Sequence, residues 1–455
     1  MQFISKNLSI NSLKIISRNA KKFSSNLKKS AVFIPAEKSG LGGVPVDDHN
    51  FVKSAKTQEF LKMENKSAAH NYHPLPVVLS RGKNVHVWDV DDKKYLDFLS
   101  AYSAVNQGHC HPRIVSALVD QSMTLTLTAR AFHNDQFPIY ADYITNLLGF
   151  DKVLPMNTGV EASETAVKLA RKWAYEVKGV PALQAKVVFA KKNFWGRTLA
   201  AVSSSCDPES YGNFGPYMPG FESVEYNNLD ELEKAISDPN TAAFMVEPIQ
   251  GEAGVVVPKS NYLNEVRRLC TKYNVLMIAD EVQTGLGRTG KLLAVQHNGV
   301  KPDIVCLGKA LSGGMMPVSA VLADDPVMLR IKPGQHGSTY GGNPIACRVA
   351  IEALKVLVDE KLSLNAEIKG KRFRDELTRI DSALIGEVRG IGLLNAIVIN
   401  GTGEKAWEIC LNLAKNGLLC KPTHSNIIRL APPLTIDDNQ LDQSIEIISK
   451  VLKEN

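Results

Sequence analysis

Short apolar segments rich in β-branched residues alternate with amphipathic, helix-type segments from about residue 152 onward. Strands that are apolar along their whole length are buried on both faces, which requires helices on both sides of a mainly parallel sheet. The pattern therefore predicts an α/β fold. The strand-type segments are 186–190, 242–246, 275–279 and 304–307, and helical patterns such as 162–176 and 262–273 separate them.

The chain has 455 residues, of which 44% are hydrophobic and 22% are charged, as in soluble globular proteins. No apolar run approaches the roughly 18–20 residues that a membrane span needs. Two apolar segments, 85–89 and 94–98, flank Asp91-Asp92 and predict a hairpin, and strands and helices mix in a different style after about residue 345. We therefore predict four parts: a leader at 1–36, an N-terminal segment at 37–100 that packs with the small domain, a large domain at 101–341 and a smaller α+β domain at 342–455.

The first 36 residues carry seven Lys or Arg and no Asp or Glu, and seven serines lie within the first thirty. Apolar residues at loosely helical spacing separate the cations. This composition is typical of a mitochondrial transit peptide, and a disordered basic tail is the alternative. The rest of the chain has 46 basic against 47 acidic residues. Without an excess of basic residues, we expect no nucleic-acid surface.

The cysteines and histidines give no pattern of a metal or disulfide site. His109 and His111 lie two residues apart, and no second ligand cluster completes a zinc site. We therefore predict no metal, no catalytic cysteine, and reduced, mostly buried thiols. The seven cysteines, none in a C-x-x-C pair, are Cys110, Cys206, Cys270, Cys306, Cys347, Cys410 and Cys420.

Polar residues follow three of the apolar segments, and sites in open α/β sheets gather at the carboxyl ends of strands. After 153–155, a turn with Gly159 opens a helix whose free N–H groups would favour an anion such as phosphate. Asp280 follows 275–279, and Lys309 follows 304–307, where burial would lower its pKa and free the amine as a nucleophile. Taken singly, such features are more often structural turns or solvated loop charges than catalytic groups.

Together, these three features match one cofactor, pyridoxal 5'-phosphate. It requires a lysine that bonds to its carbonyl carbon, a carboxylate that keeps the pyridine nitrogen protonated, and a phosphate site. The protonated ring can draw the electrons released when a substrate C–H bond breaks. Phe194 and Arg197 follow the 186–190 segment and add an aromatic that could cover the ring and a cation that could hold a carboxylate.

Seven segments of the chain resemble the class III (ω) aminotransferases over roughly residues 60–435. The segments around Asp280 and Lys309 are shared by the whole group. Those around Tyr72, Tyr102 and Phe194 are narrower and indicate ornithine aminotransferases over enzymes of N-acetylornithine, 4-aminobutyrate or diaminopelargonate. The segments are Asn71-Tyr-His-Pro-Leu-Pro76, Tyr102-Ser-Ala-Val-Asn-Gln-Gly-His-Cys-His-Pro112, Asn157-Thr-Gly-Val-Glu-Ala-Ser-Glu-Thr165, Phe194-Trp-Gly-Arg-Thr198, Glu247-Pro-Ile-Gln-Gly-Glu-Ala-Gly254, Asp280-Glu-Val-Gln-Thr-Gly285 and Gly337-Ser-Thr-Tyr-Gly-Gly-Asn-Pro344.

The resemblance implies a pyridoxal-phosphate-dependent transferase of fold type I, with a seven-stranded sheet in its large domain, and a role for each matched residue. Lys309 would bind the cofactor covalently and move protons, and Asp280 would contact the pyridine nitrogen. The remaining implied cofactor contacts are Gln283 at the ring hydroxyl, Phe194 and Val282 on the two ring faces, Gly159 and Val160 at the phosphate, and Ser338 and Thr339 reaching the phosphate from the other subunit.

The resemblance also implies substrate contacts and a reaction. Ornithine would be held by Tyr72 and Arg197 in a pocket lined by Tyr102, with Trp195 included among the substrate contacts. Arg429 would bind the α-carboxylate of 2-oxoglutarate, and Glu252 would neutralise Arg429 when ornithine is present. The implied protein is a homodimer of the mitochondrial matrix that transfers the δ-amino group of L-ornithine to 2-oxoglutarate. The alternatives are another ω-aminotransferase and a non-catalytic scaffold with the same fold.

Overall fold

The computed structural model describes residue 51 and residues 53–423 and 426–454. The predicted leader at 1–36 and the first part of the 37–100 segment lie outside these residues. Every element below lies within the unit Val44–Asn455. None of the helices in the described part is long and apolar enough to cross a membrane.

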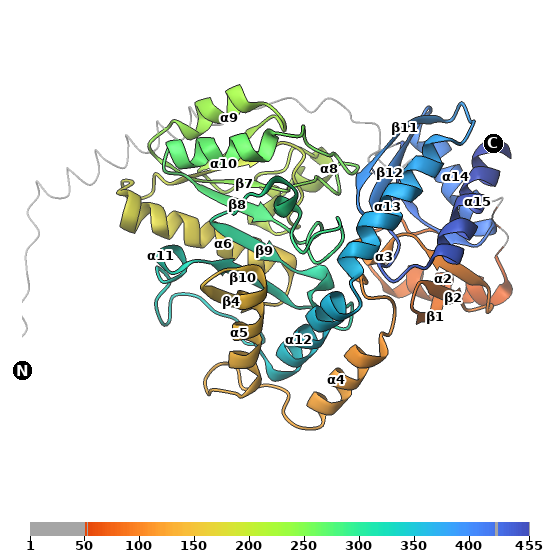
Figure 1. Ribbon diagram of the computed structural model, residues 1–455, viewed down its shortest axis with the longest axis horizontal. Helices are drawn as coiled ribbons and strands as arrows, with labels where there is room; N and C mark the ends of the chain where they lie inside the picture. Colours follow the sequence, from red (N-terminus) through yellow and green to blue (C-terminus); the bar gives the residue numbers. More distant parts are fainter. Residues whose placement is uncertain (1–50, 52, 424–425, 455) are drawn as a thin grey trace, which may run out of the picture. The chain divides into compact units, whose positions relative to one another are not determined.

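A seven-stranded sheet lies at the centre of the predicted large domain (Figure 1), in the order β4-β10-β9-β8-β7-β5-β6. Strand β10 (Ser319–Ala323) runs antiparallel to both of its neighbours, and every other pair in the sheet is parallel. The predicted mainly parallel sheet of seven strands is thus confirmed. The other strands are β4 (Lys152–Met156), β5 (Lys186–Ala190), β6 (Phe221–Val224), β7 (Thr241–Val246), β8 (Leu276–Asp280) and β9 (Ile304–Leu307).

Helices cover both faces of this sheet, and successive strand residues point to opposite faces. In β7, Phe244 and Val246 pack into a core with α9 (Leu229–Ile236) and α10 (Tyr262–Lys272). Ala243 and Met245, on the other face, pack with α6 (Gly159–Trp173). This two-sided burial explains why the strands are apolar throughout.

Helix α6 begins at Gly159, three residues before the helical pattern predicted from Ala162. The Thr158 hydroxyl accepts the Glu161 N–H, and the Glu161 carboxylate accepts the Thr158 N–H at 2.6 Å, so the two residues form a capping box. The helix runs into a π-helical turn at Ala174–Lys178. The capping box therefore fixes the helix start at the glycine turn.

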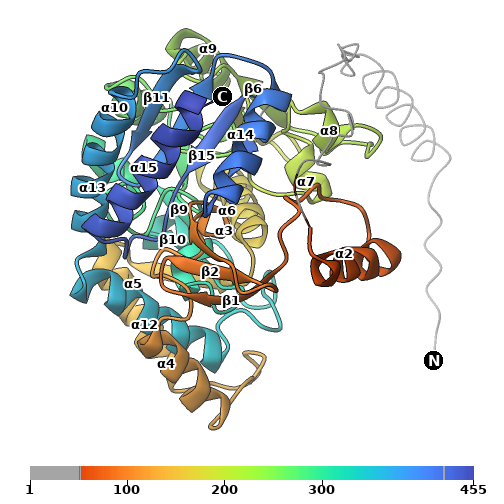
Figure 2. The same cartoon turned by 90° about the vertical axis from the view of Figure 1, so that its right-hand side faces the viewer.

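Two four-stranded sheets lie outside the central one. In the first, β1 (Leu79–Lys83), β2 (His86–Asp89) and β3 (Lys94–Asp97) form the N-terminal strands, and β13 (Leu418–Leu419) pairs in parallel with β3. The second has the order β11-β12-β15-β14 and lies within the C-terminal part. Its strands β11 and β15 are labelled in Figure 2. Its elements are β11 (Ile385–Ile391), β12 (Leu394–Ile399), β14 (Lys421–Thr423) and β15 (Ile427–Leu430), with helices α13 (Leu362–Thr378), α14 (Gly403–Lys415) and α15 (Asp438–Glu454).

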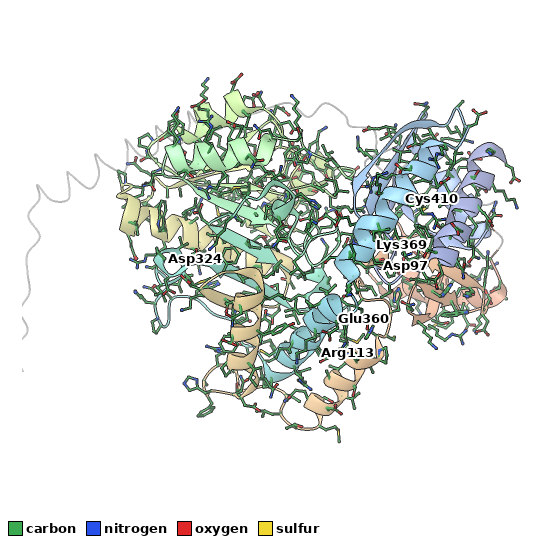
Figure 3. The ribbon with its side chains drawn as sticks, viewed as in Figure 1. Asp97, Arg113, Asp324, Glu360, Lys369 and Cys410 are labelled. Carbon is green, nitrogen blue, oxygen red and sulfur yellow. The ribbon has the colours of Figure 1, made fainter. Side chains whose placement is uncertain are left out.

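Helix α12 (Pro344–Asp359) packs against α4 (Pro112–Ser122) and α5 (Gln136–Leu148), and also contacts α13. Arg113 on α4 forms ion pairs with Glu352 and Asp359, at 2.6 and 2.8 Å. Arg113 and Glu360 are labelled at this junction in Figure 3. The helix that was assigned to the small domain thus also packs on helices of the large one, and the limits at 100 and 341 stay predictions. The remaining helices are α2 (Ala55–Ser67), α3 (Ser100–Ser103), α7 (Leu199–Val202), α8 (Pro208–Tyr211), α11 (Asp325–Met328), η2 (Ala294–Asn298) and η3 (Lys309–Ser312).

Candidate active site

The carboxyl ends of β7, β8 and β9 lie along one edge of the central sheet because these strands are parallel. Glu247 directly follows β7, Asp280 ends β8, and Lys309 follows β9 after Gly308. The three side chains lie close enough for their charges to interact. The structure thus brings the predicted Lys309 and Asp280 together and adds Glu247. Its place after a buried strand, the same as that of Asp280, was the feature that could have identified it.

Burial shifts the pKa of all three ionisable groups at this edge. It raises the pKa of Asp280 to about 6. Two effects oppose this rise: the Val282 N–H donates to Oδ1 at 3.1 Å, and the charge of Lys309 favours the ionised carboxylate. Burial raises the pKa of Glu247 to about 8, and the negative charge of Asp280 adds to this shift. Burial also lowers the pKa of Lys309, against the attraction of the nearby carboxylates. Glu247 therefore holds its proton more tightly than Asp280 does.

The start of α6 presents two free backbone donors beside these residues. The capping box uses the N–H groups of Thr158 and Glu161, whereas no hydrogen bond within the described part of the chain engages those of Gly159 and Val160. A Cβ at Gly159 would lie 2.9 Å from Cγ1 of Val282, and one at Gly308 would lie 3.3 Å from the same atom. The two glycines therefore allow the helix start and the backbone before Lys309 to approach Val282.

A second cluster joins the turn after β7 to the C-terminal sheet. Arg429 on β15 is only 3% exposed, and its Nη1 forms an ion pair with Oε1 of Glu252 at 2.7 Å. The Arg429 guanidinium lies over the Tyr102 ring, 4.7 Å from the centroid. Within the described residues, the Nε of Arg429 has no hydrogen-bond partner. Gln283 Nε2 is 3.4 Å from Glu252 Oε1. These contacts unite four of the predicted site residues.

Burial opposes ionisation of Glu252, but the attraction and hydrogen bond of Arg429 outweigh it and lower the pKa of the carboxyl group. The ion pair is therefore present at neutral pH and is lost only when acid protonates Glu252. The Nε of Arg429 is buried and has no hydrogen-bond partner among the described residues, so one donor of the guanidinium is unused. The cluster thus pairs one buried guanidinium, that of Arg429, with one carboxylate, that of Glu252.

Tyr102 lies in an unusual backbone turn. Ser100, Ala101, Tyr102 and Ser103 all have positive φ, between 46° and 73°. Left-handed geometry costs a non-glycine residue roughly 1–2 kcal/mol, so the surrounding structure must impose it. Oδ1 of Asp97, labelled in Figure 3, accepts the Leu99 and Ser100 N–H groups at 2.9 Å each. This turn directs the Tyr102 ring to Arg429.

The turn after β5 separates two neighbouring aromatic residues. The backbone N–H of Phe194 donates to Glu247 at 3.0 Å, and the Arg197 guanidinium lies 5.6 Å from the Phe194 ring centroid. Trp195 instead points into the core, where it stacks on Phe189 and donates to Ser204 Oγ at 2.8 Å. The structure therefore brings Phe194 and Arg197 to the site but places the Trp195 side chain beneath it.

The remaining predicted residues lie at the margin of the site. Tyr72 is 75% exposed and lies close enough to Tyr102 for electrostatic interaction. Asn157, two residues before Gly159, donates to Ser338 Oγ at 2.8 Å, and Thr339 is exposed. This contact lies within one chain, and the predicted contribution of Ser338 and Thr339 to a partner subunit stays a prediction.

No group of three or more His, Cys, Asp or Glu side chains in the described residues could hold a metal ion. All seven cysteines are free, with Cys110 and Cys206 exposed and the other five buried.

The fold and this arrangement of side chains together define a class of enzyme. Residues 67–452 match the family model of the class-III aminotransferases, and the chain belongs to that family. Its members use pyridoxal 5'-phosphate and share the fold of type I. The site fits this cofactor: Gly159 and Val160 have free N–H groups for a phosphate, and no described residue forms a hydrogen bond or ion pair with the Lys309 amine.

Particular relatives within the family include ornithine aminotransferases. The mitochondrial ornithine aminotransferase of Drosophila melanogaster is 65% identical over 389 residues, covering 86% of this chain and 90% of the relative. The Toxoplasma gondii ornithine aminotransferase, solved with pyridoxal phosphate at partial occupancy, has a TM-score of 0.85 and 48% identity, covering 87% of this chain and 95% of that one. A structure described as an acetylornithine aminotransferase, from Elizabethkingia anophelis, has a TM-score of 0.81 and 56% identity, covering 88% of this chain and 98% of that one.

Proposed function

We propose that this chain is a pyridoxal-phosphate-dependent ornithine δ-aminotransferase. It transfers the δ-amino group of L-ornithine to 2-oxoglutarate and forms L-glutamate and glutamate 5-semialdehyde, which cyclises to 1-pyrroline-5-carboxylate. The observation that carries the proposal is the ion pair between Glu252 and Arg429, 2.7 Å long, at the edge of the site. While the ion pair is formed, the pocket can bind an amine donor that places no carboxylate near Arg429. When the ion pair opens, the same pocket can bind an acceptor whose carboxylate contacts Arg429.

The bound cofactor supplies an electron-withdrawing ring that takes up the electrons of a broken C–H bond. Lys309 Nζ holds the cofactor and moves the proton at the reacting carbon, and the Asp280 carboxylate keeps the pyridine nitrogen protonated. Gly159 and Val160 would donate their free N–H groups to the phosphate. Phe194 and Val282 would hold the ring, and Gln283 would bind its hydroxyl.

The substrate contacts follow from the second cluster. Tyr72 and Arg197 hold the amino and carboxylate groups at the far end of ornithine, and Tyr102 lines the pocket. Arg429 binds the α-carboxylate of 2-oxoglutarate after Glu252 moves aside. Trp195 supports the turn of Phe194 and Arg197 from the core instead of touching the substrate.

A comparison of amine donors tests the proposal. With 2-oxoglutarate as acceptor, we expect kcat/KM for L-ornithine to exceed that for N-acetylornithine or 4-aminobutyrate by at least roughly 100-fold, since a site built for charged substrate groups rejects analogues that leave its own groups unpaired. Formation of 1-pyrroline-5-carboxylate identifies the δ-amino group as the one transferred. Preference for N-acetylornithine would make the chain another ω-aminotransferase, and no turnover with any donor would support the non-catalytic alternative.

We also propose a homodimer in which Ser338 and Thr339 of each subunit complete the phosphate site of the other. The exposure of Thr339 in the single chain leaves it available for such a contact. Thr339→Ala should therefore loosen the cofactor without unfolding the chain. Mixing Lys309→Ala with Thr339→Ala subunits should restore activity, because some dimers then have one site free of both changes. If the mixture is no more active than its parts and cofactor retention is unchanged, the shared site is excluded.

The mitochondrial matrix is the proposed location. The acid-free, Ser-rich composition of residues 1–36 and the mitochondrial relative support this proposal. A chain that begins near residue 37 should keep its activity in vitro but should no longer be imported by isolated mitochondria.

A further inference from the structure

Strand β14 forms two side-chain contacts with segments that lie far away in the sequence. Nζ of Lys421 donates to the backbone carbonyl of His73 at 2.7 Å, and Oγ1 of Thr423 donates to the backbone carbonyl of Glu252 at 2.8 Å. Residues 421 and 423 are two apart in a strand, so their side chains point to the same face. One short edge strand is thereby tied both to the segment of Tyr72 and to the turn of Glu252.

The same face of the sheet carries Arg429. Lys421 and Arg429 are directly opposite each other in the antiparallel pair of β14 and β15, so their side chains lie side by side. Two like charges opposite each other destabilise a sheet, and burial together with the charge of Arg429 lowers the pKa of Lys421. A cation at this position therefore opposes the stability of the sheet, which indicates that its contact with His73 has another use.

His73 is held at a second point by its ring. The imidazole stacks on the indole of Trp407, with 4.5 Å between ring centroids and 8° between the planes. Trp407 lies on α14 and is 6% exposed, so it is a rigid support. Lys421 and Trp407 thus fix the backbone and the ring of the residue that follows Tyr72. The Tyr72 side chain, 75% exposed, has little packing of its own.

We propose that Lys421 is a positioning residue that holds the Tyr72 segment beside the cluster of Arg429, Glu252 and Tyr102, and so sets the affinity for ornithine. The inference rests on the proposed function, because Tyr72 has its role in ornithine binding there. Lys421 touches neither the cofactor nor the reacting atoms. It acts through the carbonyl of His73, and Trp407 acts on the same residue from the other side.

The test uses Lys421→Met in the cofactor-loaded protein, which keeps the length of the side chain and removes the donor. We expect KM for ornithine to rise about tenfold, as for the loss of a hydrogen bond from a charged group, while kcat and KM for 2-oxoglutarate change less than about twofold. Trp407→Leu should also raise KM for ornithine. Lys405→Met, a lysine on α14 paired with Glu408 at the surface, is the matched control and should change nothing.

A double-mutant cycle separates positioning from a general effect of charge. In a Tyr72→Ala background, Lys421→Met should no longer raise KM for ornithine, because the residue through which it acts is gone. A rise that persists in this background, or an equal rise for ornithine and 2-oxoglutarate, would overturn the proposal.

Hydrogen exchange gives a readout that does not depend on turnover. The backbone amides of Tyr72, His73, Leu75 and Val77 should exchange faster in Lys421→Met than in the unchanged protein, and unchanged exchange would contradict the tether. If the unchanged protein does not use ornithine, the proposed function fails, and the exchange experiment still reports on the tether alone.

Discussion

Lys309→Ala is expected to abolish transamination in a protein that still folds. The side chain supplies both the bond to the cofactor and the proton transfer at the reacting carbon, and general acid–base catalysis alone contributes about 10²–10⁴-fold. The combined loss should therefore be at least roughly 10⁴-fold in kcat. Because burial of the Lys309 ammonium is unfavourable, its removal should not destabilise the fold.

Steady-state kinetics and thermal unfolding of the purified variant measure this result. The control is Lys301→Ala, an exposed lysine shortly before β9 that pairs with Asp324 at 2.7 Å. It should keep its activity. A Lys309→Ala protein with more than about one hundredth of normal turnover would remove the basis for the proposed chemistry.

Glu252→Ala and Arg429→Ala are expected to affect opposite half-reactions. Without Glu252, the Arg429 guanidinium is buried and unpaired during the ornithine step and attracts the α-carboxylate of the amino acid instead. Removing one partner of a buried ion pair costs about 3–5 kcal/mol, enough to redirect specificity by orders of magnitude. Glu252→Ala should therefore slow the ornithine half-reaction, spare the glutamate half-reaction and increase transfer from α-amino groups. Arg429→Ala should impair the reaction with 2-oxoglutarate far more than the reaction with ornithine.

Single-turnover rates of each half-reaction in both variants measure this separation. Glu225→Ala, a surface carboxylate paired with Lys191 at 2.6 Å, is the control. The alternative is that Glu252 only supports its own turn, whose backbone carbonyl accepts from Thr423. In that case Glu252→Ala would slow both half-reactions equally, and the switch would be excluded.

The central sheet could be predicted because burial on both faces forces the whole strand to be apolar. Strands β5 and β9 match the expected segments, and β7 and β8 differ by one residue. The direction of β10 could not be predicted, because an apolar run such as Ser319–Ala323 is the same for parallel and antiparallel pairing. The pairing of β13 with β3 rests on two residues, too short a pattern to detect.

The part of the site that lies at the carboxyl ends of buried strands could be predicted from the sequence. Asp280 ends the buried strand β8, Lys309 follows β9 by two residues, and Glu247 directly follows β7. The left-handed turn at Ser100–Ser103 was not predictable, since none of its residues is a glycine and tertiary contacts impose the geometry. The contact of Lys421 with His73 likewise joins segments that are distant in sequence.

The most direct test of the proposed function is the half-reaction of the cofactor-loaded protein with L-ornithine alone. Cofactor absorption and 1-pyrroline-5-carboxylate are followed in a single turnover, with N-acetylornithine in a parallel sample. We predict one equivalent of 1-pyrroline-5-carboxylate per site, a matching change in absorption, and a much slower change with N-acetylornithine. No change in absorption with ornithine, or an equally fast one with N-acetylornithine, would contradict the assignment.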